Sequence, residues 1–322
     1  MERVGVIGLG NIGGAIAANL VADGHDVTVA DVDPARAAAI EGARAGDVAA
    51  VAAAGDITIT SLPTPEVVAE VAAAWTAAAP AGSVLLDLST SSPAGNRAIA
   101  ERLAATGQHF VEAPLTGGAV GARNRTLVFL VGGDDEPVAR CRPLLDGLGR
   151  ATFHLGPVGA GTTMKLVNSL LAFTCSWVSL EGLSLAAAAG LDLRTVVEVV
   201  RTGGASNFFI DRAVDGLDVR GRPTEFALAL AAKDARLVEE VAESAGIPAP
   251  VAAAVSAVLA DVVDRGLGDH DWSDLVVAAE ARAGRALVLG PVDPAVDPVV
   301  DPADPAVDPV VDPADPAVEP AG

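Results

Sequence analysis

The sequence predicts an α/β protein in two parts: a doubly wound, mostly parallel sheet covered by helices, followed by an all-α domain. Three observations predict this arrangement. Strand-like and helix-like segments alternate through the first half of the chain. A glycine-rich turn joins the first strand to the first helix. Beyond about residue 159, apolar residues recur at helical spacing and no convincing strand appears.

The elements of the first half follow one another as successive βα units. Short apolar runs predict strands at 4–7, 27–30, 57–61, 83–88, 109–112, 127–131 and 151–154. Helical patterns between them lie at 13–20, 34–40, 65–78, 93–105 and 136–145. Ligands of such sheets bind beyond the carboxyl ends of the strands. We therefore expect Pro63, Ser89, Thr90 and Pro114 to share one edge with the glycine-rich turn.

Each glycine of that turn has a mechanical reason. Gly8 permits a tight turn, Gly10 lets the backbone approach a pyrophosphate, and Gly13 lets the helix pack close to the sheet. The helix N-terminus offers N–H groups to phosphates, and Asp31 ends the second strand, where an acid binds ribose hydroxyls. These features predict a Rossmann-type domain that binds a nicotinamide dinucleotide through Gly8, Leu9, Gly10, Asn11, Ile12, Gly13 and Asp31.

Asp31 also predicts which dinucleotide is used. A carboxylate at this position accepts hydrogen bonds from a free 2′-hydroxyl and repels a 2′-phosphate. Val32 and Asp33 supply no cation for such a phosphate, and Arg36 lies one helical turn further on. The sequence therefore favours NAD over NADP.

The second half is predicted to be helical. The longest pattern runs from 162 to 189, with Gly190 as its C-cap, and shorter ones lie at 192–201, 207–215, 224–245 and 249–265. A helix of this length suits a spine between domains or between subunits, so we expect a homodimer or higher homo-oligomer. The expected domains are a dinucleotide-binding domain (1–158), an all-α substrate and dimerisation domain (159–290) and a tail (291–322).

The tail is an acidic repeat in which residues 295–305 recur unchanged at 306–316. Proline at every third or fourth position forbids a helix, and the acids repel one another. A disordered or polyproline-II-like segment is therefore expected. It is interpreted either as a solubilising tail or as a docking arm for a basic partner.

Composition restricts the partners and the compartment. The formal net charge of −21 argues against nucleic acid and against an anionic membrane as partners. Neither a signal peptide nor a membrane span is predicted, because the N-terminus enters a strand and the apolar stretches carry glycine or acids. Two cysteines, Cys141 and Cys175, suggest a reducing cytoplasm without disulfides. No set of metal ligands is predicted.

Two polar clusters follow predicted strands. Residues 87–93 (DLSTSSP) carry hydroxyls that either cap the next helix or contact the nicotinamide ribose. Residues 112–122 (EAPLTGGAVGA) form a glycine-rich loop, which either binds an anion such as a carboxylate through backbone N–H groups or is an ordinary mobile loop.

A third cluster opens the long helix at 159–169 (GAGTTMKLVNS). Lys165 lies on its first turns, and Asn168 and Ser169 share the same face three and four residues later. Lys165 is either a surface lysine or a buried amine with a lowered pKa. Lys233, in a later apolar helix, has the same two interpretations.

Together these motifs resemble the β-hydroxyacid dehydrogenase family, which includes 3-hydroxyisobutyrate dehydrogenases, tartronate semialdehyde reductases and relatives of 6-phosphogluconate dehydrogenase. The resemblance covers about residues 2–285. It rests on GLGNIG at 8–13, GHDVTVAD at 24–31, SLP at 61–63, DLST at 87–90, EAPLTGG at 112–118, GAGTTMKLVNS at 159–169, KDARL at 233–237 and GDHDWSDLV at 268–276.

The resemblance implies an NAD-dependent oxidoreductase that interconverts a small β-hydroxy acid and its semialdehyde by hydride transfer. Lys165 matches the catalytic lysine, which protonates the carbonyl oxygen in reduction and accepts the hydroxyl proton in oxidation. The other implied positions are the loop for the substrate carboxylate (Thr116, Gly117, Gly118), further substrate contacts (Asn168, Ser169), a neighbour of the nicotinamide (Thr90), a lysine that closes over cofactor and substrate (Lys233), and the adenosine and ribose path (Leu62, Pro63, Val67).

Three features depart from the family pattern. Ser169 stands where many members carry a substrate-binding asparagine, and Asn168 could replace it only if the helix were rotated. Arg123 and Arg125 either recognise a second anionic group or face solvent, and the repeat tail has no counterpart in the family.

Two other functions remain open: imine reduction on the same scaffold, whose members usually lack a lysine at position 165, and a non-catalytic dinucleotide-binding interaction protein.

Overall fold

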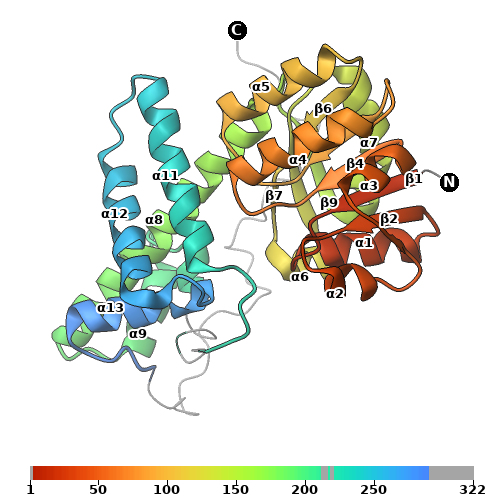
Figure 1. Cartoon of the computed structure of the whole chain (residues 1–322). Coiled ribbons are helices and arrows are strands. Elements are labelled where there is room, and N and C mark those ends of the chain that lie inside the picture. Colours follow the sequence, from red (N-terminus) through yellow and green to blue (C-terminus); the bar gives the residue numbers. More distant parts are fainter. Residues whose placement is uncertain (1–2, 212–216, 218–220, 290–322) are drawn as a thin grey trace, which may run out of the picture.

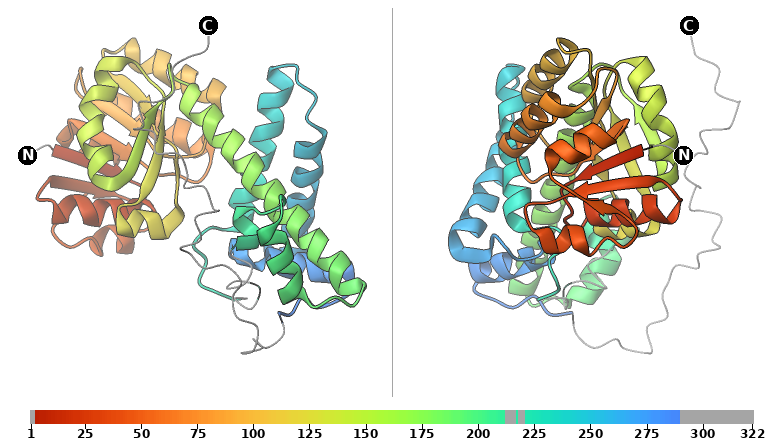
Figure 2. Two further views of the ribbon diagram at one scale, coloured as in Figure 1. Left: turned by 180° about the vertical axis from the view of Figure 1, so that it is seen from behind. Right: turned by 45° about the vertical axis from the view of Figure 1, so that its right-hand side comes forward.

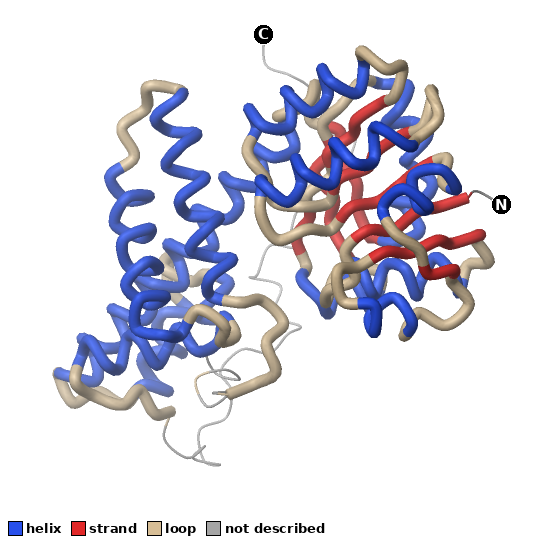
Figure 3. The backbone as a smooth tube through the Cα atoms, in the orientation of Figure 1, coloured by secondary structure: helices blue, strands red, loops and turns tan. Residues whose placement is uncertain are grey.

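The computed structural model describes residues 3–211, 217 and 221–289. These residues form an α/β body that contains all the named strands and a second, helical body (Figures 1 and 3). The tail expected at 291–322 and the end of the helix expected at 207–215 lie outside the described residues.

The main sheet has six parallel strands in the order β3-β2-β1-β4-β5-β6, as the βα alternation predicted. The strand order reverses between β1 and β4, and ligands of such sheets bind beside this point. The strands are β1 (Arg3–Ile7), β2 (Asp26–Ala30), β3 (Arg44–Ala45), β4 (Ile57–Thr60), β5 (Val84–Asp87) and β6 (His109–Glu112).

A smaller three-stranded sheet continues this body. Strand β8 pairs antiparallel with β7 and parallel with β9, and a single bridge between Glu112 and Gly132 joins the end of β6 to the residue after β8. The strands are β7 (Leu115–Thr116), β8 (Leu127–Val131) and β9 (Gly149–His154).

Helices cover both faces of the main sheet, and their apolar sides meet the buried Val, Ile and Leu residues of the strands. Proline opens α2, α4 and α5, where its missing N–H costs no hydrogen bond. The helices are α1 (Gly13–Ala22), α2 (Pro34–Ala38), α3 (Val48–Ala54), α4 (Pro65–Ala78), α5 (Pro93–Ala104), α6 (Gly118–Asn124) and α7 (Asp135–Leu148).

One long helix, α8 (Ala160–Ala188), runs from the α/β body into the helical body (Figure 2). It packs on β8 and α5 near its start and on α11, α12 and α13 further along. The remaining elements are α9 (Leu193–Thr202), α11 (Leu228–Ser244), α12 (Pro250–Val262), the π-helix η1 (Val263–Leu267), the 3₁₀-helix η2 (Trp272–Asp274) and α13 (Leu275–Ala283).

Helix α8 is also the one helix among the described residues that is long and apolar enough to cross a membrane by length and composition alone. Core helices pass the same test, and the buried side chains of α8, including Leu166, Phe173 and Leu180, pack inside this protein.

Several sequence-based expectations were wrong in detail. The segment 112–122 is not one glycine-rich loop, because Thr116 lies in β7 and α6 begins at Gly118. The helix expected from 224 begins only at Leu228, since Ala227 pairs with Asp271 in an isolated bridge. The short elements β3, β7, α3 and α6, and the last helix α13, were not expected.

Candidate active site

The glycine-rich turn lies at the carboxyl end of β1, beside the point where the strand order reverses. A Cβ on Gly13 would collide with the carbonyl of Gly8, and Gly8 itself has a φ of +88°. A Cβ on Gly10, in contrast, would meet nothing within 4 Å. The protein itself therefore does not require glycine at position 10, whereas a ligand in contact with the backbone would.

The start of α1 fits a phosphate group. Its N-cap is Ile12, which has no side-chain acceptor, so the first N–H groups of the helix receive no side-chain cap. Asn11 is exposed at the same turn, and its Nδ2 donates to the carbonyls of Thr224 and Glu225 at 2.9 and 3.1 Å. The glycine-rich turn is thus hydrogen-bonded to the segment that precedes α11 in the helical body.

Asp31 follows β2 and faces the same turn. Its Oδ2 accepts a hydrogen bond from the Leu9 N–H at 2.6 Å, and its Oδ1 accepts one from the Asp33 N–H at 2.8 Å. Each carboxylate oxygen keeps a further lone pair for a ribose hydroxyl. Val32, the next residue, is fully exposed, and Arg36 forms a 3.7 Å ion pair with Asp33.

The ends of β4 and β5 are joined by a buried chain of hydrogen bonds. Asp87 Oδ1 accepts from Thr60 Oγ1 at 2.7 Å and from Ser89 Oγ at 2.6 Å, and Ser89 Oγ accepts from the Leu62 N–H at 2.9 Å. Burial raises the pKa of Asp87 to about 6, although the hydrogen bonds from Ser89 and Thr60 oppose this shift. This chain holds the turn at Leu62 and Pro63.

The hydroxyls after β5 therefore have different roles. Ser92 caps α5 by accepting from the Gly95 N–H at 3.0 Å, as one of the two interpretations stated. Thr90 is half-buried, and its carbonyl accepts from Lys233. Val67 lies half-buried in the first turn of α4, next to the turn that contains Leu62 and Pro63.

Lys165 lies on the second turn of α8, half-buried, where the α/β and helical bodies meet. Burial lowers the pKa of its amine below 10.5, nearby Lys233 lowers it further, and the carboxylate of Asp234 raises it. Within the described parts of the chain, its Nζ donates to no acceptor. The amine is therefore available to a bound molecule.

Asp234 and Lys233 complete this cluster from α11. Lys233 Nζ lies 2.9 Å from Asp234 Oδ1 and donates to the Thr90 carbonyl at 2.6 Å. Ser169 is buried, and its Oγ lies 3.5 Å from Asp234 Oδ2, at the outer limit of a hydrogen bond. Asn168 is half-buried beside it.

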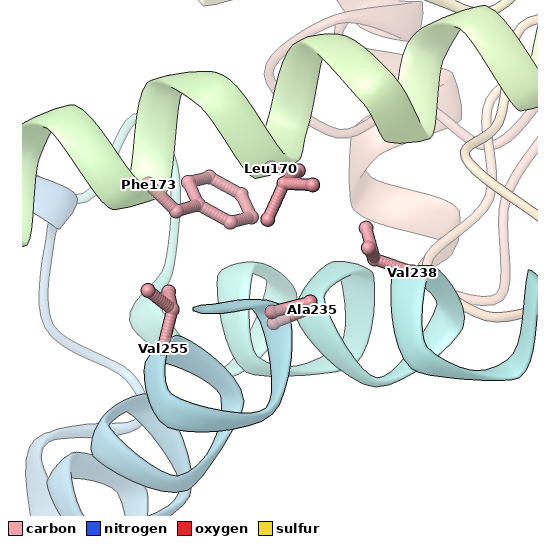
Figure 4. Close-up of a pocket in the computed structure, with 6 residues that line it drawn as sticks. Leu170, Phe173, Ala235, Val238 and Val255 are labelled. Atoms are coloured by element: carbon pink, nitrogen blue, oxygen red, sulfur yellow. The ribbon is translucent and has the colours of Figure 1, made fainter. Parts of the chain in front are cut away.

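The helices behind this cluster form a dry, apolar seam. Leu170 and Ala235 follow Ser169 and Asp234 directly in sequence, and both line a small apolar cavity between α8, α11 and α12 (Figure 4). Phe173, Val238, Ala252 and Val255 complete its wall. On this side the cluster is therefore backed by apolar side chains, and the polar partners of Asp234 are Lys233 and Ser169.

The loop predicted to bind the substrate carboxylate makes no direct hydrogen bond to Lys165 within the described residues. Thr116 is half-buried at the end of β7, and Gly117 and Gly118 are exposed, with φ values of +116° and +61° at the start of α6. None of these three hydrogen-bonds to Lys165 or Ser169 within the described residues.

Arg123, in α6, and Arg125, the C-cap residue of this helix, bind protein groups. Arg125 Nη1 lies 2.6 Å from Asp23 Oδ2, and the same guanidinium also donates to the carbonyls of Gly147 and Asn19. Neither interpretation given for Arg125, an anion site or a solvated side chain, describes it. Arg123 forms a 2.5 Å ion pair with Glu225, next to the Asn11 contacts.

Sequence reasoning missed Asp234, Glu112 and Glu225 as members of the site. Asp234 carried one signal, an acid directly after a lysine in an otherwise apolar helix. The chain has a second signal: Lys165 and Lys233 are its only lysines, among 21 basic residues. Arginine cannot release a proton near neutral pH. A lysine in a chain whose other basic residues are arginines therefore indicates a position where a titratable amine is used.

The fold and these groups define a dinucleotide-binding oxidoreductase with an α-helical second domain. A family model of the NAD-binding domain of 6-phosphogluconate dehydrogenase matches residues 3–156. A second model, the NAD-binding domain of NADP-dependent 3-hydroxyisobutyrate dehydrogenase, matches residues 159–279. The chain belongs to the β-hydroxyacid dehydrogenase family, as its motifs indicated.

Curated relatives agree with this assignment. A 2-(hydroxymethyl)glutarate dehydrogenase of Eubacterium barkeri is 32% identical over 290 residues, covering 88% of this chain and 96% of the relative. An NAD-dependent L-serine dehydrogenase of Pseudomonas aeruginosa is 30% identical over 291 residues, covering 85% and 96% of the two chains.

Solved structures show the same fold. The 3-hydroxyisobutyrate dehydrogenase of Mycobacterium tuberculosis with L-serine aligns with a TM-score of 0.78 and 28% identity, covering 86% of this chain and 98% of that one. An imine reductase from Myxococcus stipitatus with NAD⁺ aligns with a TM-score of 0.59 and 21% identity, covering 86% and 99%. The second likeness shows the fold alone.

Proposed function

We propose that the protein is an NAD-dependent dehydrogenase that interconverts a small β-hydroxy acid and its semialdehyde, with Lys165 as general acid and base. The observation that carries the proposal is the Lys165 amine, half-buried between the two bodies with a lowered pKa. The substrates named for the relatives, serine and 2-(hydroxymethyl)glutarate, both carry a primary hydroxyl on the carbon β to a carboxylate.

Lys165 would move the proton of the reaction. In reduction, its ammonium form would donate a proton to the aldehyde oxygen; a bound reduced nicotinamide would supply the hydride for the carbonyl carbon. In oxidation, its neutral amine accepts the hydroxyl proton. Burial lowers the pKa of the amine and so favours its neutral form, while the Asp234 carboxylate opposes this shift and favours the ammonium form.

The cofactor would be held along the carboxyl edge of the sheet. The turn from Gly8 to Gly13 would receive the pyrophosphate, and Asp31 the adenosine ribose. Leu62, Pro63 and Val67 would line the path of the adenosine and ribose, and Thr90 would lie beside the nicotinamide. Because a carboxylate stands at Asp31 and Arg36 is paired with Asp33, the free 2′-hydroxyl of NAD is favoured over the phosphate of NADP.

The substrate would lie between the cofactor and α8. The backbone at Thr116, Gly117 and Gly118 would bind its carboxylate, and Ser169 and Asn168 would contact its far end. Lys233, already bound to the Thr90 carbonyl, would close the helical body over cofactor and substrate.

A second copy of the chain would cover the open face of α8. Five exposed apolar residues recur three, four or seven positions apart along this helix and so form one stripe: Met164, Val167, Leu171, Val178 and Leu185. A stripe of this kind is self-complementary in a two-fold dimer. The measurement is molar mass by light scattering, and Leu171→Glu combined with Val178→Glu should give a monomer. A monomeric unaltered protein would contradict the dimer.

We also propose a cytoplasmic location. Cys141 lies in α7 and Cys175 in α8, and no disulfide joins them. Fractionation of the native cells tests this, and recovery outside the cytoplasm would contradict it.

The assay for the activity follows the absorbance of reduced cofactor. NAD or NADP is offered with 3-hydroxyisobutyrate, serine, glycerate, 3-hydroxypropionate or threonine, and a cyclic imine with reduced cofactor forms a separate arm. We expect turnover with NAD and at least one hydroxy acid. Turnover in the imine arm alone would assign imine reduction instead, and binding of NAD without any turnover would leave only a dinucleotide-binding protein.

A further inference from the structure

Glu112, the last residue of β6, is completely buried and accepts four hydrogen bonds. Its Oε1 accepts from the N–H groups of Gly159 at 2.8 Å and Thr162 at 3.0 Å. Its Oε2 accepts from Asn96 Nδ2 at 2.7 Å and from Thr162 Oγ1 at 2.9 Å. One carboxylate thus joins the sheet, α5 and the first turn of α8.

No lysine or arginine pairs with this carboxylate within the described residues. Its negative charge is instead stabilised by the amide Nδ2 of Asn96, the Thr162 hydroxyl and the N-terminal N–H groups of α8. The positive end of a long helix dipole favours an anion at this place. The hydrogen bonds of Glu112 and the position of α8 therefore depend on each other.

The cap of α8 differs from the local caps of five other helices. The N-cap residues of α2, α3, α4, α5 and α9 bind the first turn with their own side chains, namely Asp33, Asp47, Thr64, Ser92 and Asp192. The N-cap of α8 is Gly159, and the capping carboxylate comes from another element, 47 residues earlier. A local cap satisfies the N–H groups equally well. A remote cap additionally fixes where the helix stands on the sheet.

The first turn of α8 also fits the sheet without spare room. A Cβ on Gly132 would lie 2.6 Å from Glu112 Oε1 and 3.0 Å from the Gly161 nitrogen. A Cβ on Gly161 would collide with the carbonyl of Leu130, in β8. The backbone of α8 is therefore in direct contact with the strand edge around Glu112, and a change there has to move the helix.

Lys165 follows Thr162 by three residues, about 4.5 Å along the helix axis. After Glu112 the chain continues through Pro114 into β7, which ends at Thr116. Thr116 is one of the residues expected to bind the substrate carboxylate. In the sheet register, Glu112 lies opposite Asp87, which holds the cofactor-side turn through Ser89. Glu112 is thus linked to three parts of the site: Lys165, the loop at Thr116 and the turn held by Asp87.

We propose that Glu112 is a positioning residue for Lys165: by binding the first turn of α8, its carboxylate sets where the lysine amine stands relative to the substrate and the nicotinamide. This inference rests on the proposed dehydrogenase function. Glu112 itself touches neither substrate nor cofactor. Replacing it should lower the turnover number far more than the affinity for NAD.

The test compares Glu112→Gln with Asp192→Asn, which makes the same carboxylate-to-amide change at the local cap of α9. Glutamine replaces one carboxylate oxygen with an NH₂ group, which cannot accept, so both hydrogen bonds accepted by that oxygen are lost. We expect kcat of Glu112→Gln to fall about 10- to 100-fold, because small displacements of a reacting group have effects of this size. The affinity for NAD should stay unchanged, and Asp192→Asn should behave like the unaltered protein.

A spectroscopic readout separates positioning from general loosening. Because the chain has only two lysines, ¹³Cε-lysine NMR of the full chain shows their side chains, and Lys233→Arg assigns them. In Glu112→Gln we expect the titration of Lys165 to shift while that of Lys233 stays fixed. An unchanged kcat, or equal shifts of both lysines, would overturn the proposal.

Should Glu112→Gln fail to fold, Thr162→Val replaces it. Valine keeps the shape and the backbone bond but removes the hydroxyl donor to Oε2, and Thr162→Ser restores that donor. We expect kcat and the Lys165 signal to change in the valine variant and to recover with serine, and recovery in neither would overturn the proposal. If the unaltered protein turned over no hydroxy acid, the proposed function would fail, while the NMR comparison would still decide whether Glu112 places the amine.

Discussion

Lys233 Nζ lies 2.9 Å from Asp234 Oδ1, its neighbour in sequence, and donates to the carbonyl of Thr90 in the other body. Both side chains are largely withdrawn from water, with 13% and 3% of their surface exposed. The pair therefore neutralises a buried carboxylate next to Lys165 and ties α11 to the end of β5. The same two residues thus form a buried ion pair and a contact between the two bodies.

Replacing Asp234 with Asn should alter both functions of this pair. The Asp234 carboxylate raises the pKa of Lys165, so its loss should move the Lys165-dependent limb of the pH–rate profile to lower pH in the oxidative direction. Loss of a buried charged partner should also destabilise the fold by about 1–3 kcal/mol. Steady-state rates across pH and urea unfolding measure the two effects. A limb that moves to higher pH would contradict the assigned electrostatics.

Lys165 should reduce the stability of the folded protein. Its folded-state pKa lies below the unfolded value of 10.5 because burial disfavours the ammonium. The free-energy cost of burying this ammonium on folding is therefore fully present at pH values below the folded pKa. It disappears as pH rises from the folded pKa toward 10.5. Lys165→Met should therefore raise Tm at neutral pH, with an advantage that shrinks above that window. Thermal unfolding across pH measures this, and a lower Tm in the variant would contradict it.

Asp87 should give a pH dependence of the opposite kind. Its pKa rises from 3.8 to about 6 on folding, so the unfolded state loses its proton first and stability falls as pH rises between these values. Above pH 6 the cost reaches at most about 3 kcal/mol. Asp87→Asn keeps an oxygen acceptor for Thr60 and Ser89 and should lack this fall. Denaturant titrations at several pH values compare the two proteins, and parallel curves would show that Asp87 does not titrate in this range.

Asp31 should decide the cofactor preference. Its carboxylate favours a free 2′-hydroxyl and also holds the glycine turn through the Leu9 N–H. Asp31→Ala should therefore weaken NAD binding and narrow the ratio of kcat/KM between NAD and NADP. Kinetics with both cofactors measure this ratio. If the unaltered protein preferred NADP, the electrostatic interpretation of Asp31 would be wrong.

The sequence predicted the long-range plan of the fold because that plan depends on strong local signals. Runs such as 4–7 (VGVI) and 57–60 (ITIT) consist mostly of β-branched residues, and the glycine turn has its own spacing. Strands β3 and β7 have two residues each, too few to show a period, and α6 begins with two glycines that read as a loop. These elements form because neighbouring strands and helices supply their partners.

Site residues that belong to a local sequence motif could be predicted. Residues whose role depends on contacts with partners far away in sequence could not. Lys165 and Asp31 occupy recognisable patterns, so they could be named from the chain alone. Glu112 and Asp234 also depend on contacts remote in sequence, with Gly159, 47 residues from Glu112, and with Ser169, 65 residues from Asp234. The contacts of Glu225 with Arg123 are equally remote in sequence, and no local pattern marks them.

The most direct test of the dehydrogenase mechanism is the turnover of Lys165→Ala on the best hydroxy acid, together with its affinity for NAD. Removal of a general acid and base should lower kcat by about 10²- to 10⁴-fold, while the affinity for NAD stays unchanged because the glycine turn and Asp31 are untouched. Undiminished turnover in this variant would contradict the role of Lys165 in moving the proton.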